Sequence, residues 1–458
     1  MVERHPFLPN LDPETVEKML KAVNATSISD LFADIPQQFA LKRKLRIPEG
    51  VTEAALRKEM LRRLGKNQTP PDALCFLGGG VWPHSIPAAV DSILSRQEFY
   101  TSYTPYQPEI SQGMLQALFE YQSLMCDILG MQACNSSMYD WASAAGEAVR
   151  MAARVKQRKT MLLAGNIGPS RLEVIRTYAG PMGVRMEKVD FDKRTGRLDL
   201  GSLKAKLTPD VAGIYTESPN CFGVIEEEIA QAFEMVHGAG GLGIVGVDPV
   251  SVSVLKEPGS YGADIVVGDG QPLGIPMNYG GPHIGIFAVA DTALERAMPG
   301  RLIGMTTTKD GTQKAFCMVL QTREQHIRRE GATSNICTNQ ALLALAAASY
   351  LAMLGRNGFR RLGEINIANS HYAAERIGEV EGAKAPLFTG QFFNDFVVGY
   401  SRRKAVEVRD RLAKRGIMAG HPLTSDFPGI GEAGAYSVTE SHSAEEIDVL
   451  VDALKEVL

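Results

Sequence analysis

The spacing of apolar and polar residues divides the chain into three stretches. Over residues 1–70, apolar side chains recur three and four positions apart, after a proline at position 13 and again over 52–64, which predicts a helical arm. Over 71–310, apolar runs rich in Val and Ile alternate with amphipathic stretches. Residues 311–458 open with a polar segment rich in Thr and Arg, and predict a connecting segment followed by a small α+β domain.

The runs in the middle stretch are typical of buried strands, because they are apolar without strict alternation. Helical stretches separate most of them, so we expect a large α/β domain with a mainly parallel sheet of about seven strands and helices on both faces. The expected strands are 160–164, 184–189, 211–216, 242–247, 264–267 and 284–289, and the expected helices 87–97, 113–129, 140–157 and 169–179. Further along, helices are expected at 338–354, 402–415 and 443–458, and strands at 394–399, 416–419 and 435–438.

Composition narrows the functional classes. The chain is 45% hydrophobic and 22% charged with a net charge of -4, which is typical of a globular protein and gives no basic patch for nucleic acid or a membrane surface. The apolar run at 341–354 is too short to span a bilayer, and the first residues lack the apolar core of a signal peptide, so a cytoplasmic protein is expected. The six cysteines and eight histidines show no metal-ligand spacing, and we expect no metal site.

A glycine-rich segment at 238–243, GAGGLG, matches the G-x-G-x-x-G pattern of dinucleotide-binding proteins. That pattern requires a strand before it and a helix after it. Here the expected helix comes first and the strand second. A tight helix-to-strand connection is therefore the better interpretation.

Two positions follow the layout of fold-type I pyridoxal-phosphate enzymes. Asp248 follows an expected strand, where an acid would pair with the pyridinium nitrogen of the cofactor, and the loop after the next strand would carry the lysine that binds the cofactor covalently. Gln271 stands at that lysine position and has no nucleophilic amine. The alternative for Asp248 is an acid at a strand end that caps a turn.

The helix expected from Asp140 opens with the small residues of DWASAAGE, which would let an anion approach its free amide groups. Because Asp140 and Glu147 already place negative charge in the first turns, the prediction for Asp140 is a helix cap rather than a neighbour of the cofactor phosphate.

A tyrosine-rich segment, residues 100–107, carries phenols at every third position between Ser and Thr, and two prolines argue against a helix there. Such a loop suits recognition of a polar ligand at an interface between subunits. The alternative is a loop that packs on its own subunit. Its candidate contact residues are Tyr100, Ser102, Tyr103, Thr104, Tyr106 and Gln107. A basic stretch at 321–330 has Lys309 and Lys314 upstream. It is either a solvated or salt-bridged helix, or else a surface for an acidic partner or the mouth of a site.

Several segments together resemble the P-protein family of the glycine cleavage system. They are YTSYTPYQPEISQG at 100–113, GDGQPLG at 268–274, YGGP at 279–282, LQTREQHIRRE at 320–330 and ATSNICTNQ at 332–340. In the split form of this family one subunit carries the lysine and the other lacks it. The length and Gln271 match the lysine-less subunit 1.

The resemblance implies an activity and a set of partners. The family decarboxylates glycine, releases carbon dioxide and transfers the aminomethyl group to the lipoyl arm of H-protein, and it is classed as an oxidoreductase. The resemblance implies a lysine-bearing subunit 2 as partner, in an αβ or α2β2 assembly, with pyridoxal 5'-phosphate on that partner. Asp140, Asp248 and Gln271 would then be a vestigial cofactor pocket, and residues 100–107 would reach the partner's site. No catalytic residue is assigned to this chain.

Two other functions are kept beside this one. The first is a self-sufficient pyridoxal-phosphate enzyme whose lysine is Lys256, Lys309 or Lys314. The second is a scaffold subunit that retains the fold without contributing to the chemistry.

Overall fold

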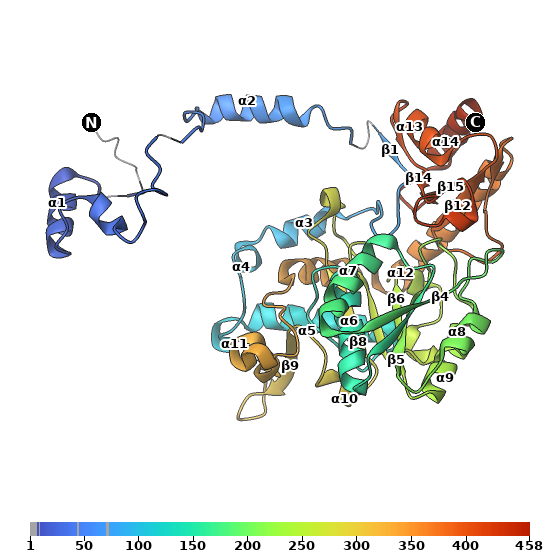
Figure 1. Ribbon diagram of the computed structural model, residues 1–458, viewed down its shortest axis with the longest axis horizontal. Coiled ribbons are helices and arrows are strands. Elements are labelled where there is room, and N and C mark those ends of the chain that lie inside the picture. The colour runs from blue at the N-terminus through green and yellow to red at the C-terminus, as the bar shows by residue number, and fades with distance from the viewer. Residues whose placement is uncertain (1–6, 9, 44, 70–72) are drawn as a thin grey trace. The chain divides into compact units, whose positions relative to one another are not determined.

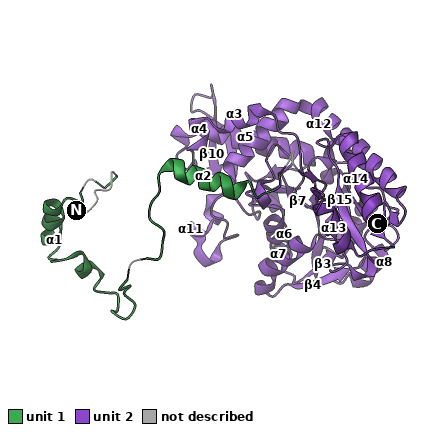
Figure 2. Cartoon of the chain, turned by 90° about the horizontal axis from the view of Figure 1, so that it is seen from above, with its two compact units in different colours: residues 1–67 green, residues 68–458 purple. Residues whose placement is uncertain are grey.

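The computed structural model describes residues 7–8, 10–43, 45–69 and 73–458. Contacts divide the chain into two compact units, Met1–Asn67 and Gln68–Leu458 (Figure 2). The finer division of the second unit into a large domain that ends at residue 310 and a small domain after it stays a prediction.

The first unit consists of short helices joined by extended chain. They are α1 (Pro13–Ala22), the 3-10 helix η1 (Ile28–Phe32) and α2 (Glu53–Leu64). The Asp12 carboxylate accepts a hydrogen bond from the Thr15 amide at 2.9 Å and so caps α1. None of the described residues of this unit is buried, and the apolar side chains of its helices are half-buried or exposed.

A seven-stranded sheet forms the centre of the second unit (Figure 1), in the order β2-β8-β7-β6-β5-β3-β4. The pairs from β4 through β3, β5 and β6 to β7 are parallel, and β8 runs antiparallel to both β7 and β2. The strands are β2 (Ala133–Cys134), β3 (Thr160–Ala164), β4 (Arg185–Val189), β5 (Val211–Glu217), β6 (Leu242–Val247), β7 (Ile265–Asp269) and β8 (Gly285–Val289). The predicted mainly parallel sheet is confirmed.

Helices pack against this sheet and build one large apolar core with it. They are α3 (Ala88–Leu94), α4 (Gln97–Tyr100), α5 (Gln112–Leu129), α6 (Trp141–Lys156), α7 (Pro169–Ala179), α8 (Leu200–Lys206), α9 (Ile229–Gly238) and α10 (Thr292–Glu295). A hairpin of β9 (Leu302–Thr307) and β10 (Lys314–Val319) packs on α5 and leads to α11 (Gln325–Arg328). The predicted connection at 238–243 is confirmed, because α9 ends at Gly238 and β6 begins at Leu242.

The long helix α12 (Ala341–Gly378) differs from the prediction, which ended it at residue 354. The helix continues through a kink at Gly355, whose φ of 57° and ψ of -179° are not helical. Glycine accepts this conformation because it has no Cβ. By length and composition α12 could cross a membrane, but Ala344, Ala346 and Ala347 on it lie in the core of this unit.

The C-terminal part has a separate four-stranded sheet in the order β11-β12-β15-β14 and its own apolar core. Its strands are β11 (Ala383–Lys384), β12 (Asp395–Tyr400), β14 (His421–Pro422) and β15 (Ala433–Ser437), and its helices are α13 (Ala405–Ala413) and α14 (Ala444–Val457). The short β1 (Leu74–Cys75) pairs in parallel with β13 (Ile417–Met418). This pairing places the residues around β1 beside the C-terminal part.

Candidate functional site

Three polar residues lie at the carboxyl ends of β6 and β7. Asp248 directly follows β6, Asp269 is the last residue of β7, and Gln271 comes two residues later. Because β6 and β7 are parallel neighbours, these ends share one edge of the sheet. Ligands of open α/β sheets bind at this edge.

The Gln271 side chain is 1% exposed and is fully engaged by hydrogen bonds. Its Oε1 accepts from the Trp82 amide at 2.9 Å, and its Nε2 donates to the carbonyl oxygens of Trp82 at 3.0 Å and Ile275 at 2.8 Å. The amide group thus pairs with the Trp82 backbone in both directions, as a neighbouring strand would. Both of its polar atoms thus have backbone partners within the chain.

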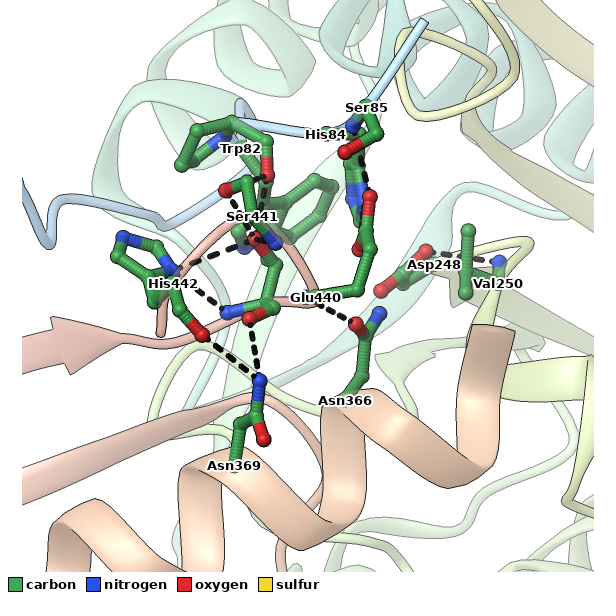
Figure 3. A network of polar contacts seen from close by, with 12 residues as sticks. Trp82, His84, Ser85, Asp248, Val250, Asn366, Asn369, Glu440, Ser441 and His442 are labelled. Atoms are coloured by element: carbon green, nitrogen blue, oxygen red, sulfur yellow. Dashed lines mark hydrogen bonds and ion pairs between the residues drawn. The ribbon is translucent and has the colours of Figure 1, made fainter. Parts of the chain in front are cut away.

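Trp82 belongs to a segment, residues 79–85, that we call the strap. The Gly79 amide and the Trp82 indole donate to the two oxygens of Asp395, at 3.1 and 2.8 Å. Farther along, Glu440 contacts the His84 Nδ1 at 2.8 Å and accepts from the Ser85 amide at 2.7 Å (Figure 3). The strap is therefore held between the C-terminal part and the sheet edge at Gln271.

Asp248 lies beneath the strap and is 3% exposed. Its Oδ1 accepts from the Val250 amide at 2.9 Å (Figure 3), whereas its Oδ2 has no hydrogen-bond partner among the described residues. Burial raises the pKa of Asp248 to about 7, and the nearby His84 imidazole offsets part of that rise. The bond to Val250 matches the predicted alternative of a turn cap at a strand end.

A buried network fills the space next to Asp248. The Arg171 guanidinium lies 4.1 Å above the ring of Trp141 and pairs with Glu217 at 2.6 Å. The Trp141 indole donates to the Tyr215 hydroxyl at 3.0 Å, and that hydroxyl donates to Glu217 at 2.9 Å. These charges are paired and hydrogen-bonded, as buried charges must be.

The cavity that remains between the strap, this network and Asp248 measures about 10 Å³. Trp82, Trp141, Arg171 and Asp248 line it. Such a space accommodates roughly one water molecule, whereas ligand pockets of proteins usually measure about 300–1,000 Å³. The residues at this position therefore do not fit pyridoxal phosphate.

A larger cavity of about 340 Å³ is lined by both Trp82 and Gln271. It is lined by residues of β1 and by His84, Met277 and His442, and Asp248 is not among its lining residues. Lysine is absent from the lining of both cavities. Lys256 lines a different cavity, next to Tyr261, and Lys309 and Lys314 lie in the β9–β10 hairpin. None of the three candidate lysines of a self-sufficient enzyme thus contributes to the space beside Asp248.

The prediction that Asp140 caps a helix is confirmed. The Asp140 side chain accepts a hydrogen bond from the Ser143 amide at 2.7 Å, and the Asp140 amide donates one to the Ser143 hydroxyl at 3.1 Å. The next amide, that of Trp141, donates to the Asp269 carboxylate at 3.3 Å. The start of α6 is consequently surrounded by carboxylates and is unsuited to a phosphate group.

The tyrosine-rich segment lies elsewhere and does not line either cavity. Tyr100 ends α4, which corrects the expectation that no part of the segment is helical, since Pro105 and Pro108 restrict only residues near them. Tyr100, Tyr103 and Tyr106 are 68%, 77% and 49% exposed. Ser102 and Thr104 are half-buried and Gln107 is exposed. The structure thus brings Asp140, Asp248 and Gln271 to one sheet edge and leaves 100–107 as a separate, accessible surface.

A buried arginine that the sequence analysis did not identify lies under this segment. Arg301 is 6% exposed and donates to the hydroxyl oxygens of Thr104 at 3.0 Å and Tyr106 at 3.2 Å. It also donates to the Cys337 carbonyl and the Thr338 hydroxyl of the segment before α12. A single arginine before an apolar strand carries no local pattern from which this role could have been predicted.

The basic stretch at 321–330 forms a 3-10 turn and the short α11 rather than one solvated helix. Its His326 ring meets the Tyr106 ring edge-on at 6.5 Å between centroids. Arg323 donates to the Gly300 carbonyl at 2.9 Å, and burial lowers its pKa to about 10. This stretch therefore adjoins the tyrosine-rich segment.

Comparisons with known proteins agree on one family. The family model described as "Glycine cleavage system P-protein" matches residues 6–454. A probable glycine dehydrogenase (decarboxylating) subunit 1 from Aeropyrum pernix is 48% identical over 99% of both chains, and one from Staphylothermus marinus is 46% identical over 100% of this chain and 99% of its own length. A crystal structure of glycine decarboxylase (P-protein) of the glycine cleavage system, in inhibitor-bound form, is 37% identical with a TM-score of 0.89 and full coverage of both chains. A sphingosine-1-phosphate lyase from Burkholderia pseudomallei shares the fold at 14% identity, with a TM-score of 0.65 and coverage of 91% and 92% of the two chains.

Proposed function

The chain belongs to the P-protein family of the glycine cleavage system, and from this membership we propose that it is a lysine-less subunit that completes the active site of a lysine-bearing partner. In this proposal the pair decarboxylates glycine and transfers the aminomethyl group to lipoylated H-protein. Pyridoxal phosphate supplies the electron sink for that chemistry and is held by the partner. An αβ or α2β2 assembly in the cytoplasm is part of the same proposal.

One observation carries the proposal: the Gln271 side chain is hydrogen-bonded to the backbone of Trp82 and Ile275, and the cavity beside Asp248 measures only about 10 Å³. A chain of this family that cannot hold the cofactor itself needs another subunit for the reaction. The chain spans 99% of the length of these two subunit 1 relatives.

The contribution of this chain is proposed to come from the tyrosine-rich segment. The six candidate contact residues carry hydroxyl and amide groups that can bind a carboxylate or a phosphate. They are Tyr100, Ser102, Tyr103, Thr104, Tyr106 and Gln107. Three exposed phenols on one short segment are unusual for a surface in contact with water only, and aromatic residues of this kind are enriched at protein interfaces. The segment would enter the partner's site when the two subunits associate.

Reconstitution tests the proposal. The chain alone, incubated with pyridoxal phosphate, should show no cofactor absorbance in the visible region and no exchange between glycine and bicarbonate. Addition of the lysine-bearing subunit should restore both. Exchange by the isolated chain, together with a borohydride-labelled peptide that contains Lys256, Lys309 or Lys314, would establish the self-sufficient enzyme instead.

A scaffold role is the second candidate, because the filled space beside Asp248 is also what a subunit without chemistry would have. Replacement of Tyr100, Tyr103 and Tyr106 together by Phe separates the two functions, since it removes the hydroxyls and keeps the rings. We expect a loss of glycine exchange of tenfold or more, because each hydroxyl hydrogen bond to a charged group contributes about 1.5–3 kcal/mol. Unchanged kinetics in a pair that still assembles would favour the scaffold.

A further inference from the structure

Arg301 is a buried cation without a carboxylate partner among the described residues. All four of its hydrogen-bond partners are neutral oxygens, which belong to Thr104, Tyr106, Cys337 and Thr338. Its Nε lies buried and has no hydrogen-bond partner among these residues. Buried charges in proteins are otherwise paired, because their transfer from water costs several kcal/mol. The positive charge under the tyrosine-rich segment thus has no paired carboxylate in the part of the chain that the structure describes.

The guanidinium also determines the direction of two hydroxyl groups. Arginine has only donors, so the oxygens of Thr104 and Tyr106 must act as acceptors toward it. Each hydroxyl then has its own proton free to donate elsewhere. No hydrogen bond from either hydroxyl to another group is found in the described part of the chain, and Tyr106 is 49% exposed.

The backbone holds these two hydroxyls in place. Pro105 between them is buried, and the Tyr106 amide donates to the Thr104 carbonyl at 2.8 Å, which makes a tight turn. The Arg301 guanidinium also lies 5.4 Å from the centre of the Tyr106 ring, a distance that allows a cation–π interaction. The carbonyl of Arg301 itself accepts from the Ser136 amide at 2.8 Å, so the arginine is anchored to the loop before α6.

We propose that Arg301, Thr104 and Tyr106 form a binding site for an anionic oxygen, in which Arg301 is the positioning residue and the two hydroxyls are the donors. Two O–H donors held by a guanidinium that has only neutral partners among the described residues suit a phosphate or carboxylate group, since charge-assisted hydrogen bonds are stronger than neutral ones. This inference deepens the proposed function, on which the identity of the ligand rests: the anion is the cofactor phosphate or the glycine carboxylate in the partner's site.

The first test uses the full chain alone and inorganic phosphate as the probe. Calorimetric titration should show weak, saturable binding that weakens about tenfold or more in Arg301→Met and in Tyr106→Phe. Arg301→Lys retains the charge but not the two-pronged geometry, and should lie between wild type and Arg301→Met. Arg158→Met is the matched control, because Arg158 also donates to two neutral carbonyl oxygens, those of Val211 and Ala239, at 2.8 and 2.9 Å.

The second test uses the reconstituted pair and identifies the source of the anion. If the ligand is the cofactor phosphate, Arg301→Met raises the Kd for pyridoxal phosphate about tenfold to a hundredfold and leaves the KM for glycine unchanged at saturating cofactor. If it is the glycine carboxylate, the KM changes and the Kd does not. The double variant Arg301→Met/Tyr106→Phe should be no weaker than the worse single variant, because Arg301 acts through the hydroxyl.

The inference is overturned if the wild-type chain binds no phosphate, if Arg301→Met binds it as wild type does, or if the effects of Arg301→Met and Tyr106→Phe add. Failure of Arg301→Met to fold is detected by circular dichroism, and the exposed Tyr106→Phe then decides the outcome. Failure of the proposed function looks different: the wild-type pair shows no glycine exchange, while the phosphate titration of the chain alone still supports or overturns the anion site.

Discussion

Replacement of Gln271 by alanine should release the strap and lower the stability of the chain. The change removes three hydrogen bonds, to the Trp82 amide, the Trp82 carbonyl and the Ile275 carbonyl. With a net contribution of about 1 kcal/mol for each bond, the expected loss is about 3 kcal/mol, and more where a buried backbone group stays unpaired. Equilibrium unfolding in urea, followed by circular dichroism, measures this loss as a lower midpoint.

Replacement of Gln271 by lysine tests the meaning of this position more sharply. If the absent amine were the only obstacle, Gln271→Lys would bind pyridoxal phosphate covalently and gain visible absorbance. The structure predicts no such gain, because the strap and the Trp141–Arg171 pair leave a cavity of only about 10 Å³ beside Asp248. A buried ammonium at this position should instead destabilise the chain by at least as much as alanine does.

Gln122→Ala is the matched control for both variants. The Gln122 side chain pairs with the Ile303 backbone in the same two-way manner, at 3.0 Å to the carbonyl and 2.9 Å from the amide. Its loss should cost a similar free energy of unfolding without loosening the strap. Hydrogen exchange at the Trp82 amide should therefore rise in Gln271→Ala and not in Gln122→Ala. Stoichiometric cofactor absorbance in Gln271→Lys, or a wild-type midpoint in Gln271→Ala, would refute the reasoning.

Three further predictions concern the same fold. Burial raises the pKa of Asp248 to about 7, so the folded state favours the protonated acid. The stabilising contribution of this acid is complete below its unfolded pKa of 3.8 and is lost as the pH rises through about 7. Urea midpoints should therefore fall less between about pH 5 and about pH 8 in Asp248→Asn than in wild type. A Cβ at Gly246 would lie 2.6 Å from the Trp141 Nε1 and 2.7 Å from the Tyr215 hydroxyl, so Gly246→Ala should destabilise by about 1–3 kcal/mol in the same assay. A chain that begins at residue 68 should retain the wild-type unfolding midpoint, since no described residue before it is buried, but should bind the lysine-bearing subunit more weakly in sedimentation experiments.

Local patterns were sufficient for most of the fold. The strands at 160–164 and 242–247 begin and end where predicted, because each is a continuous apolar run between polar or glycine-rich residues. Helix α7 likewise begins at its predicted proline, which suits the first position of a helix. The end of α12 was missed because the apolar run stops near Gly355, whereas tertiary packing continues the helix to Gly378.

The candidate sites depend on pairings that no local pattern contains. Trp82 and Gln271 are 189 residues apart in the chain, and Thr104 and Arg301 are 197 apart. Sequence alone could identify Gln271 only by what it lacks, an amine, and could identify the tyrosines only by their spacing. Neither pattern contains the partner on the other side of the contact, so the strap and the buried arginine could not be predicted.

The contacts of Gln271 with the Trp82 backbone change the interpretation of this residue. As a lost lysine, it would leave an open pocket that a single reversion could restore. As a residue whose amide holds both backbone groups of Trp82, it contributes to the closure of that pocket, and a reversion would remove bonds that the fold now uses. Asp248 fits the same view, since its Oδ1 accepts from the Val250 amide and so caps the turn after β6. Because the space beside Asp248 is filled and the tyrosine-rich segment is exposed, we infer that the chemical contribution of this chain lies at its surface, where a partner can reach it.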